Sequence, residues 1–223
     1  LMLRTSEKQD YVLTNYWQHI ETYLTDPQRD DITDFFRVYL IAKNQSVVNT
    51  DKVYPEFKKA FSNNISDDQS YESLDTFYGE ILRILKYYRF LKFDIDVNNE
   101  FTKLKSAAFI MRYLRIEAFF PYVVSVMKYW QDGHLSDDEI AEVFDVLCVY
   151  FSRRIVVNLS TASLDNYFAG LHRNILSSVE QNDAVYIEVL KYTMLSRSGQ
   201  TRLPRNNEIE TAIKANFTYN QRS

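Results

Sequence analysis

The stretch Ser136–Ile155 reads SDDEIAEVFDVLCVYFSRRI, and it carries the clearest evidence for the fold. Its first four residues have the spacing of a capping box, in which the Ser136 hydroxyl and the Glu139 carboxylate satisfy free amides at a helix start. The apolar residues that follow recur three and four positions apart: Ile140, Val143, Phe144, Leu147, Phe151 and Ile155. This period predicts one amphipathic helix whose apolar face is buried.

The same period recurs in nearly every other segment, while turn-forming residues are scarce, with 4 Gly and 4 Pro in 223 residues. Hairpin-rich β architectures need such turns, and helical ones do not. The sequence therefore predicts an all-α fold, a multi-helix bundle of about nine or ten helices with little or no sheet. We expect one helical domain over residues 1–223. The polar stretch 62–70 is either a loop within it or a boundary between a small N-terminal helical part and a larger C-terminal bundle, and the acidic stretch 93–100 is a connection.

The composition limits the compartment and the partners. The formal net charge is −4, so the chain has no bulk basic character. Its single cysteine, Cys148, excludes an intramolecular disulfide and a cysteine-built zinc site. No apolar run reaches the roughly 18–20 residues that span a bilayer. We therefore expect a cytoplasmic protein that does not bind a membrane.

Motifs for catalysis and for cofactor binding are missing from the sequence. There is no glycine-rich phosphate loop, no Gly-x-Ser-x-Gly elbow and no pair of histidines one helical turn apart. We expect no catalytic residue, no cofactor and no metal in this chain. His134 and the acidic residues 137–139 either hold a divalent ion or complement the positive end of a helix dipole, and we favour the second interpretation. Cys148 lies beside the apolar stripe and is expected to be a buried, unreactive thiol.

Two arginines fall on apolar helix faces. On a helical wheel Arg154 lies between Val143 and Leu147, and Arg115 lies on the stripe of a helix expected over residues 101–118. Because an unpaired buried guanidinium is very unfavourable, each must find a carboxylate, backbone carbonyls or a bound anion. We favour an internal structural role over a site that faces a partner.

Two basic groups are candidates for contacts with nucleic acid. The first is Lys103, Lys105 and Arg112 on one predicted helix, and the second is Arg197, Arg202 and Arg205 in the loop before the last helix. Nearby aromatic residues would stack on bases. The alternative is a solvated helix face and a loop, with no ligand at either place.

The stretch 150–168 reads YFSRRIVVNLSTASLDNYF and resembles the central helical region of the GmrSD-type modification-dependent (type IV) restriction endonucleases. In that family a helix ends in paired arginines, and a short turn with threonine leads to the next helix. Three further landmarks occur in compatible order: Phe35–Leu40 followed by Val53–Lys58, then Phe119-Phe120-Pro121, then Leu203–Ile209 with Tyr219. The resemblance covers most of the chain, about residues 11–219, and the paired arginines are its most specific part.

The resemblance implies a three-part protein in which helices connect an N-terminal nucleotide-hydrolysing domain to a C-terminal HNH nuclease domain. The Asp-Gly-Gln-Gln-Arg motif of the first domain is absent here, because His134 follows Asp132-Gly133, and the HNH histidine pattern is absent as well. Only Arg153 and Arg154 carry over, without an assigned role. The chain is then expected to be the connecting domain of a phage-defence DNA restriction endonuclease, with flanking domains of the same polypeptide, and DNA, as its partners. The alternative is a free-standing helical protein-interaction module.

Overall fold

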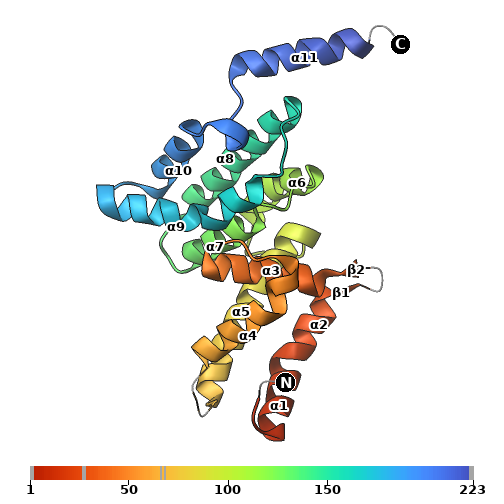
Figure 1. Cartoon of the computed structure of the whole chain (residues 1–223), viewed down its shortest axis with the longest axis vertical. Coiled ribbons are helices and arrows are strands. Elements are labelled where there is room, and N and C mark those ends of the chain that lie inside the picture. The colour runs from red at the N-terminus through yellow and green to blue at the C-terminus, as the bar shows by residue number, and fades with distance from the viewer. Residues whose placement is uncertain (1–2, 27–28, 66, 68, 221–223) are drawn as a thin grey trace. The chain divides into compact units, whose positions relative to one another are not determined.

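The computed structural model describes residues 3–26, 29–65, 67 and 69–220, and they form an almost wholly helical chain (Figure 1). The α-helices are α1 (Ser6–Val12), α2 (Gln18–Leu24), α3 (Asp31–Asn44), α4 (Val53–Asn64), α5 (Tyr71–Phe93), α6 (Lys105–Tyr113), α7 (Phe120–Gln131), α8 (Asp137–Val156), α9 (Leu164–Asn182), α10 (Tyr186–Leu195) and α11 (Asn206–Asn220). A π-helical turn, Leu13–Trp17, joins α1 to α2 without a break, so the described residues contain ten helical segments. The predicted all-α multi-helix fold is confirmed. None of the described helices is both long and apolar enough to cross a membrane.

Shorter elements complete the architecture of the described residues. Three 3₁₀ turns occur, at Thr50–Lys52, Thr102–Leu104 and Gly199–Thr201. One pair of two-residue antiparallel strands, β1 (Thr25–Asp26) and β2 (Arg29–Asp30), precedes α3. Regular sheet is therefore minimal in this part of the chain, as the sequence predicted.

The chain folds into two compact units, Leu1–Asp96 and Val97–Ser223. The boundary follows α5, where Asp94 adopts the left-handed conformation with φ 62° and Asn99 has φ 54°. Asp and Asn tolerate this conformation better than most residues, so the acidic stretch 93–100 ends the helix and connects the units. The stretch 62–70 begins in the last turn of α4 and leads to α5 within the first unit, so it does not divide the two units. The division thus falls later in the chain than the polar composition of 62–70 suggested.

Aromatic side chains build the core of the first unit, where α3, α4 and α5 pack together. The Phe36 ring lies 5.8 Å from the Trp17 ring and 4.9 Å from the Phe57 ring, centre to centre. The Phe61 and Phe77 rings meet edge to face at 5.6 Å. Trp17 and Phe36 are stacked and the other two pairs are edge to face, and both arrangements are favourable for aromatic rings, which explains how a phenylalanine-rich sequence fills this space.

Helix α8 runs through the second unit and packs against α6, α7, α10 and α11. Its capping box forms as predicted: the Ser136 side chain accepts from the Glu139 amide, and the Glu139 carboxylate accepts from the Ser136 amide. The buried face carries Phe151, whose ring lies 4.9 Å from the Phe119 ring and 5.5 Å from the Phe168 ring. Because α8 is 20 residues long, its two ends lie about 30 Å apart, and each end carries one cluster of charged residues.

Two details of the predicted helices are wrong. Ile155 is exposed rather than buried, because the core-facing positions in the last turns of α8 are Tyr150, Phe151 and Arg154. The helix expected over residues 101–118 is shorter, since α6 ends at Tyr113. The next helix, α7, then begins at Phe120 with proline in its first turn, as expected for Pro121.

Candidate functional site

Arg154 is 2 % exposed, which confirms its predicted place on the apolar face of α8. Its Nη1 donates to the carbonyl oxygen of Arg202 at 2.9 Å, and its Nη2 donates to the carbonyl oxygen of Ser160. The guanidinium also lies over the Tyr150 ring, 5.3 Å from its centre. The charge is thus balanced by carbonyl dipoles, by an aromatic face and by the negative end of the α8 dipole. Arg154 ties the turn that follows α8, at Ser160, and the distant segment at Arg202 to the end of α8.

Two neighbours of Arg154 fasten the same C-terminal segment. Arg153 donates from Nε to the carbonyl oxygen of Pro204 at 2.9 Å and from Nη2 to Oδ1 of Asn206 at 2.7 Å. The Tyr150 hydroxyl donates to the carbonyl oxygen of Thr201 at 2.8 Å. The segment between α10 and α11 has little regular structure, and these bonds from one rigid helix hold it in place.

This segment, the last turns of α8 and the end of α10 surround a pocket of about 610 Å³, which we call the arginine pocket. Its volume is in the range of small-ligand sites. Twelve residues line it: Val149, Arg153, Leu195, Arg197, Ser198, Gly199, Arg202, Leu203, Pro204, Arg205, Asn206 and Asn207. Four of them are arginines and none is acidic. The structure therefore brings the predicted loop group, Arg197, Arg202 and Arg205, together with one of the paired arginines of α8.

Among the described residues, the carboxylate of Glu208 is the one that forms hydrogen bonds to residues lining the arginine pocket. It accepts two hydrogen bonds from the Arg202 guanidinium, one of them 2.7 Å long, and one from the Arg205 amide at 2.8 Å. The Arg202 guanidinium, followed by the Arg205 amide, lowers the pKa of Glu208 below its ordinary value. Arg197 donates from Nε to the Thr201 hydroxyl and lies over the Tyr167 ring at 4.7 Å.

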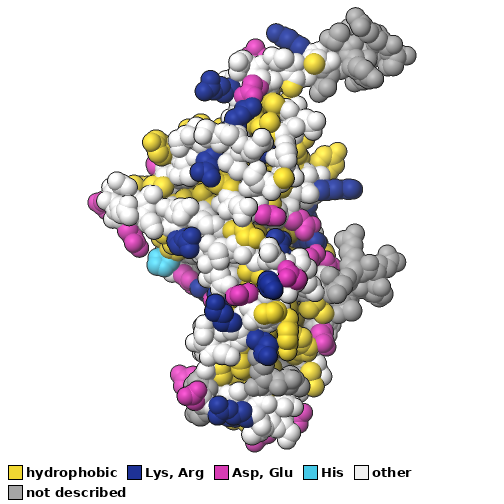
Figure 2. Space-filling view, viewed as in Figure 1, with side chains coloured by type: hydrophobic (Ala, Val, Ile, Leu, Met, Phe, Trp, Pro, Cys, Tyr) yellow, Lys and Arg dark blue, Asp and Glu magenta, His cyan; other side chains and the backbone are white. Residues whose placement is uncertain are grey.

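Positive charge is thus in excess at this place in a chain whose net charge is −4. Within the part of the chain that the structure describes, Arg153, Arg197 and Arg205 form no ion pair with a carboxylate, whereas Arg202 does. Figure 2 shows no broad band of one sign on the face in view, where blue and magenta side chains are interspersed. The arginine pocket is a local concentration of guanidinium groups that suits a phosphate, because guanidinium matches phosphate in charge and hydrogen-bond geometry.

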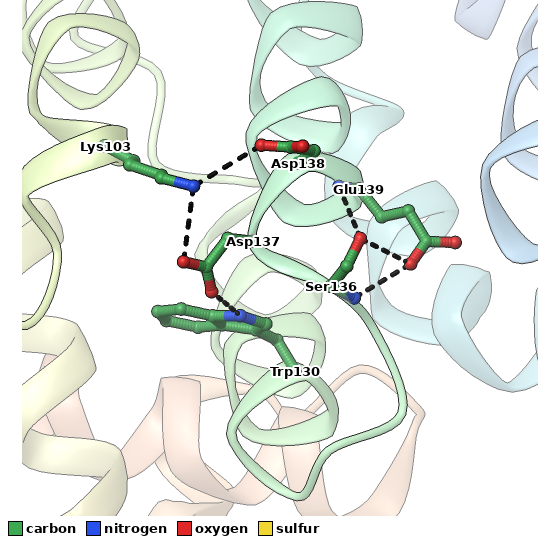
Figure 3. Close-up of polar contacts among 6 residues, drawn as sticks. All are labelled: Lys103, Trp130, Ser136, Asp137, Asp138 and Glu139. Atoms are coloured by element: carbon green, nitrogen blue, oxygen red, sulfur yellow. Dashed lines mark hydrogen bonds and ion pairs between the residues drawn. The ribbon is translucent and has the colours of Figure 1, made fainter.

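The opposite end of α8 carries the other charged cluster, shown in Figure 3. Lys103 lies 3.3 Å from Oδ2 of Asp137 and 3.4 Å from Oδ1 of Asp138. The Trp130 indole donates to the other Asp137 oxygen at 3.1 Å. Hydrogen bonds to Asp137 and Asp138 raise the pKa of Lys103. This basic residue is therefore already neutralised by two carboxylates.

The acidic residues 137–139 act at a helix start, as the dipole interpretation proposed. Glu139 is engaged in the capping box, where the Ser136 amide and hydroxyl lower its pKa. The His134 ring stacks on the Tyr129 ring, with 4.4 Å between the ring centres. Among the described residues no group of three or more His, Cys, Asp and Glu side chains is arranged to hold a metal ion.

The remaining candidates on and beside α6 do not join the arginine pocket. The Lys105 ammonium lies 3.2 Å from Oδ1 of Asn99, and Arg112 lies in the last turn of α6. The prediction for Arg115 is wrong: it is exposed and lies outside α6 with φ 53°. The helix that would have buried it ends at Tyr113, so the helical periodicity does not determine which way Arg115 faces.

Two buried polar features were present in the sequence but were not singled out. Tyr150 precedes Arg154 by one helical turn, and this spacing places both on one face.

His172 is buried, with its Nδ1 2.9 Å from the Tyr186 hydroxyl, and that hydroxyl donates to the Tyr122 hydroxyl at 3.2 Å. Burial lowers the pKa of His172 to about 4, with a smaller contribution from Lys128. Cys148 is also buried as predicted, and burial raises its pKa to about 11.

A second pocket, of about 580 Å³, lies in the first unit between the end of α3 and α4. Three lysines line it, and two of them pair with a carboxylate, unlike Arg153, Arg197 and Arg205 of the arginine pocket. Lys43 lies 2.8 Å from the Glu80 carboxylate, and Lys52 lies 3.5 Å from that of Asp51. Glu56 also lines this pocket. Its charge is more nearly balanced than that of the arginine pocket.

Comparisons of the chain with models of protein families, with curated proteins and with solved structures find no match. The geometry of the arginine pocket is thus the strongest guide to function within the described residues.

Proposed function

We propose that this chain is a non-catalytic helical domain of a DNA-acting restriction system and that its arginine pocket binds phosphate groups of nucleic acid. Nucleotide hydrolysis and DNA cleavage would be supplied by flanking domains of the same polypeptide, and the location would be cytoplasmic. The observation that carries the proposal is the convergence of Arg153, Arg197, Arg202 and Arg205 on one pocket. The resemblance of residues 150–168 to the GmrSD-type central region supports the wider setting.

The physical reason is electrostatic. Arg153 is held by hydrogen bonds, so binding a phosphate there requires little further ordering of its side chain. Each neutralised phosphate releases condensed counterions, which makes such binding favourable and sensitive to salt. A helical unit with such a pocket would anchor nucleic acid near catalytic domains without performing chemistry itself.

A second candidate function is that of a protein-interaction module, and one observation favours it. Phe109, Ile110 and Tyr113 are exposed together on α6. Neighbouring exposed apolar side chains are typical of surfaces that contact another protein. This candidate predicts partner binding that depends on α6 and is indifferent to the arginines of the pocket.

The double substitution Arg197→Gln with Arg205→Gln should weaken binding of a short DNA at low salt by about tenfold or more. It should also reduce the slope of log affinity against log salt by roughly 0.7 to 0.9 per arginine. Fluorescence anisotropy over a salt series measures both quantities. The matched control is Lys103→Gln with Lys105→Gln, which changes the net charge equally at the other basic group. The proposal fails if the control weakens binding as much as the arginine substitutions, or if the wild-type protein binds no DNA at low salt.

A further inference from the structure

Exposed apolar side chains lie directly beside the guanidinium groups of the arginine pocket. Val149 and Leu195 line the pocket, and Leu195 is 69 % exposed. Tyr192 is 73 % exposed and precedes Leu195 by three residues on α10. Residues at this spacing share one helix face, so Tyr192 and Leu195 form an apolar strip that leads into the pocket.

Helix α10 is held against α8, which fixes the strip relative to the arginines. The Lys191 ammonium lies 2.7 Å from Oε1 of Glu142 on α8 and 3.2 Å from Oε1 of Glu188 on α10. Leu190, on the other side of α10, is fully buried. Tyr192 therefore projects from a helix whose opposite face is anchored in the core.

Phosphate and base contacts make different demands on a protein surface. A duplex presents phosphates outward and keeps its base faces stacked inside. An apolar strip beside the phosphate contacts would therefore find no base face to stack on. A single strand exposes base faces, and these stack on aromatic side chains while arginines hold the backbone. The described residues hold both elements, a guanidinium cluster at the end of α10 and an exposed tyrosine about one helical turn before that end.

We infer that the arginine pocket takes single-stranded nucleic acid, with the backbone phosphate among Arg153, Arg197 and Arg205 and a neighbouring base stacked on Tyr192. This inference rests on the proposed function and narrows it to one class of nucleic acid. Arg202 is paired with Glu208 and orders the segment between α10 and α11, so it has a positioning role. The α6 group is a poorer fit, because Lys103 is paired with Asp137 and Asp138.

The test compares an oligothymidylate of about ten nucleotides with a blunt hairpin duplex of the same phosphate count, using the whole chain at low salt. The single strand should bind more tightly than the duplex. Tyr192→Ala should weaken binding of the single strand by about tenfold and leave duplex binding within about twofold. Tyr192→Phe should retain most of the affinity, because the ring supplies the stacking.

Tyr113→Ala is the matched control, since Tyr113 is 79 % exposed, lies beside the other basic group and does not line the pocket. It should leave both affinities unchanged. Equal binding of the two nucleic acids, or loss with Tyr113→Ala but not with Tyr192→Ala, would overturn the inference. If Tyr192→Ala has no effect while the arginine substitutions still weaken binding, the inference fails and the proposed function stands. If neither nucleic acid binds, both fail.

Discussion

Arg154→Ala is expected to lower the free energy of unfolding of the second unit by about 3 to 5 kcal/mol. The substitution leaves a cavity at a position that is 2 % exposed, and it removes the donors that satisfy the carbonyls of Ser160 and Arg202. It also frees two segments from the end of α8. Urea unfolding followed by tryptophan fluorescence measures the change. Replacing Trp17 by phenylalanine in every variant leaves Trp130, in the second unit, as the reporter.

Arg153→Ala is the control for this prediction. Arg153 is adjacent, only half-buried, and binds the same C-terminal segment through Pro204 and Asn206. Its loss should lower the free energy of unfolding by about 1 kcal/mol, because water replaces most of its contacts. Arg154→Met should fall between the two, since it keeps the apolar stem and the buried Nε atom of Arg154 has no hydrogen-bond partner to lose. Equal losses for Arg153→Ala and Arg154→Ala would contradict the structural role given to Arg154.

The stability of the second unit should fall by up to about 3 kcal/mol as the pH is lowered from about 6.5 to about 4, because of His172. Burial lowers the pKa of this histidine from 6.5 to about 4. Between these values the unfolded chain takes up a proton that the folded chain excludes, so acid favours unfolding. Above pH 6.5 the side chain is neutral in both states and contributes no pH dependence. Unfolding free energies from urea titrations at several pH values measure the effect.

His172→Gln should flatten this part of the pH profile, because glutamine does not titrate and retains a polar group for the Tyr186 hydroxyl. The variant is expected to be less stable than the wild type at neutral pH, so the slope is the diagnostic quantity. His134→Gln is the control, since His134 is exposed and stacked on Tyr129. It should leave the slope as it is in the wild type. A slope that persists in His172→Gln would show that other groups cause the acid sensitivity.

Local features of the fold could be predicted from the sequence because local physics determines them. The capping box at Ser136 and the burial of Arg154 both follow from spacing within one helix. The prediction for Arg115 failed because a wheel assumes that the helix continues, and α6 stops at Tyr113. The place where the chain divides into two units depends on which helices pack together, so the polar composition of 62–70 was a poor guide to it.

The candidate site could be predicted only in pieces. Arg153 was singled out by a resemblance, and Arg197, Arg202 and Arg205 were singled out as a basic loop. Their meeting depends on hydrogen bonds between residues about fifty positions apart, such as that from Arg153 to the Pro204 carbonyl. No periodicity or motif encodes a contact of that range. Tyr192 was missed because an exposed tyrosine gains meaning only when its neighbours in space are known.

Glu208→Gln tests the central claim most directly, because it should improve binding rather than damage it. The substitution removes the one carboxylate bound at the arginine pocket among the described residues, and glutamine keeps an oxygen for the Arg205 amide. Removing one charge at contact distance in a hydrated site is expected to change the affinity by about fivefold. Glu210→Gln is the control, an exposed residue on the same helix with the same change in net charge. We expect tighter, more salt-dependent DNA binding by Glu208→Gln than by Glu210→Gln. Unchanged or weaker binding by a folded Glu208→Gln protein would contradict the assignment of the arginine pocket as the phosphate site.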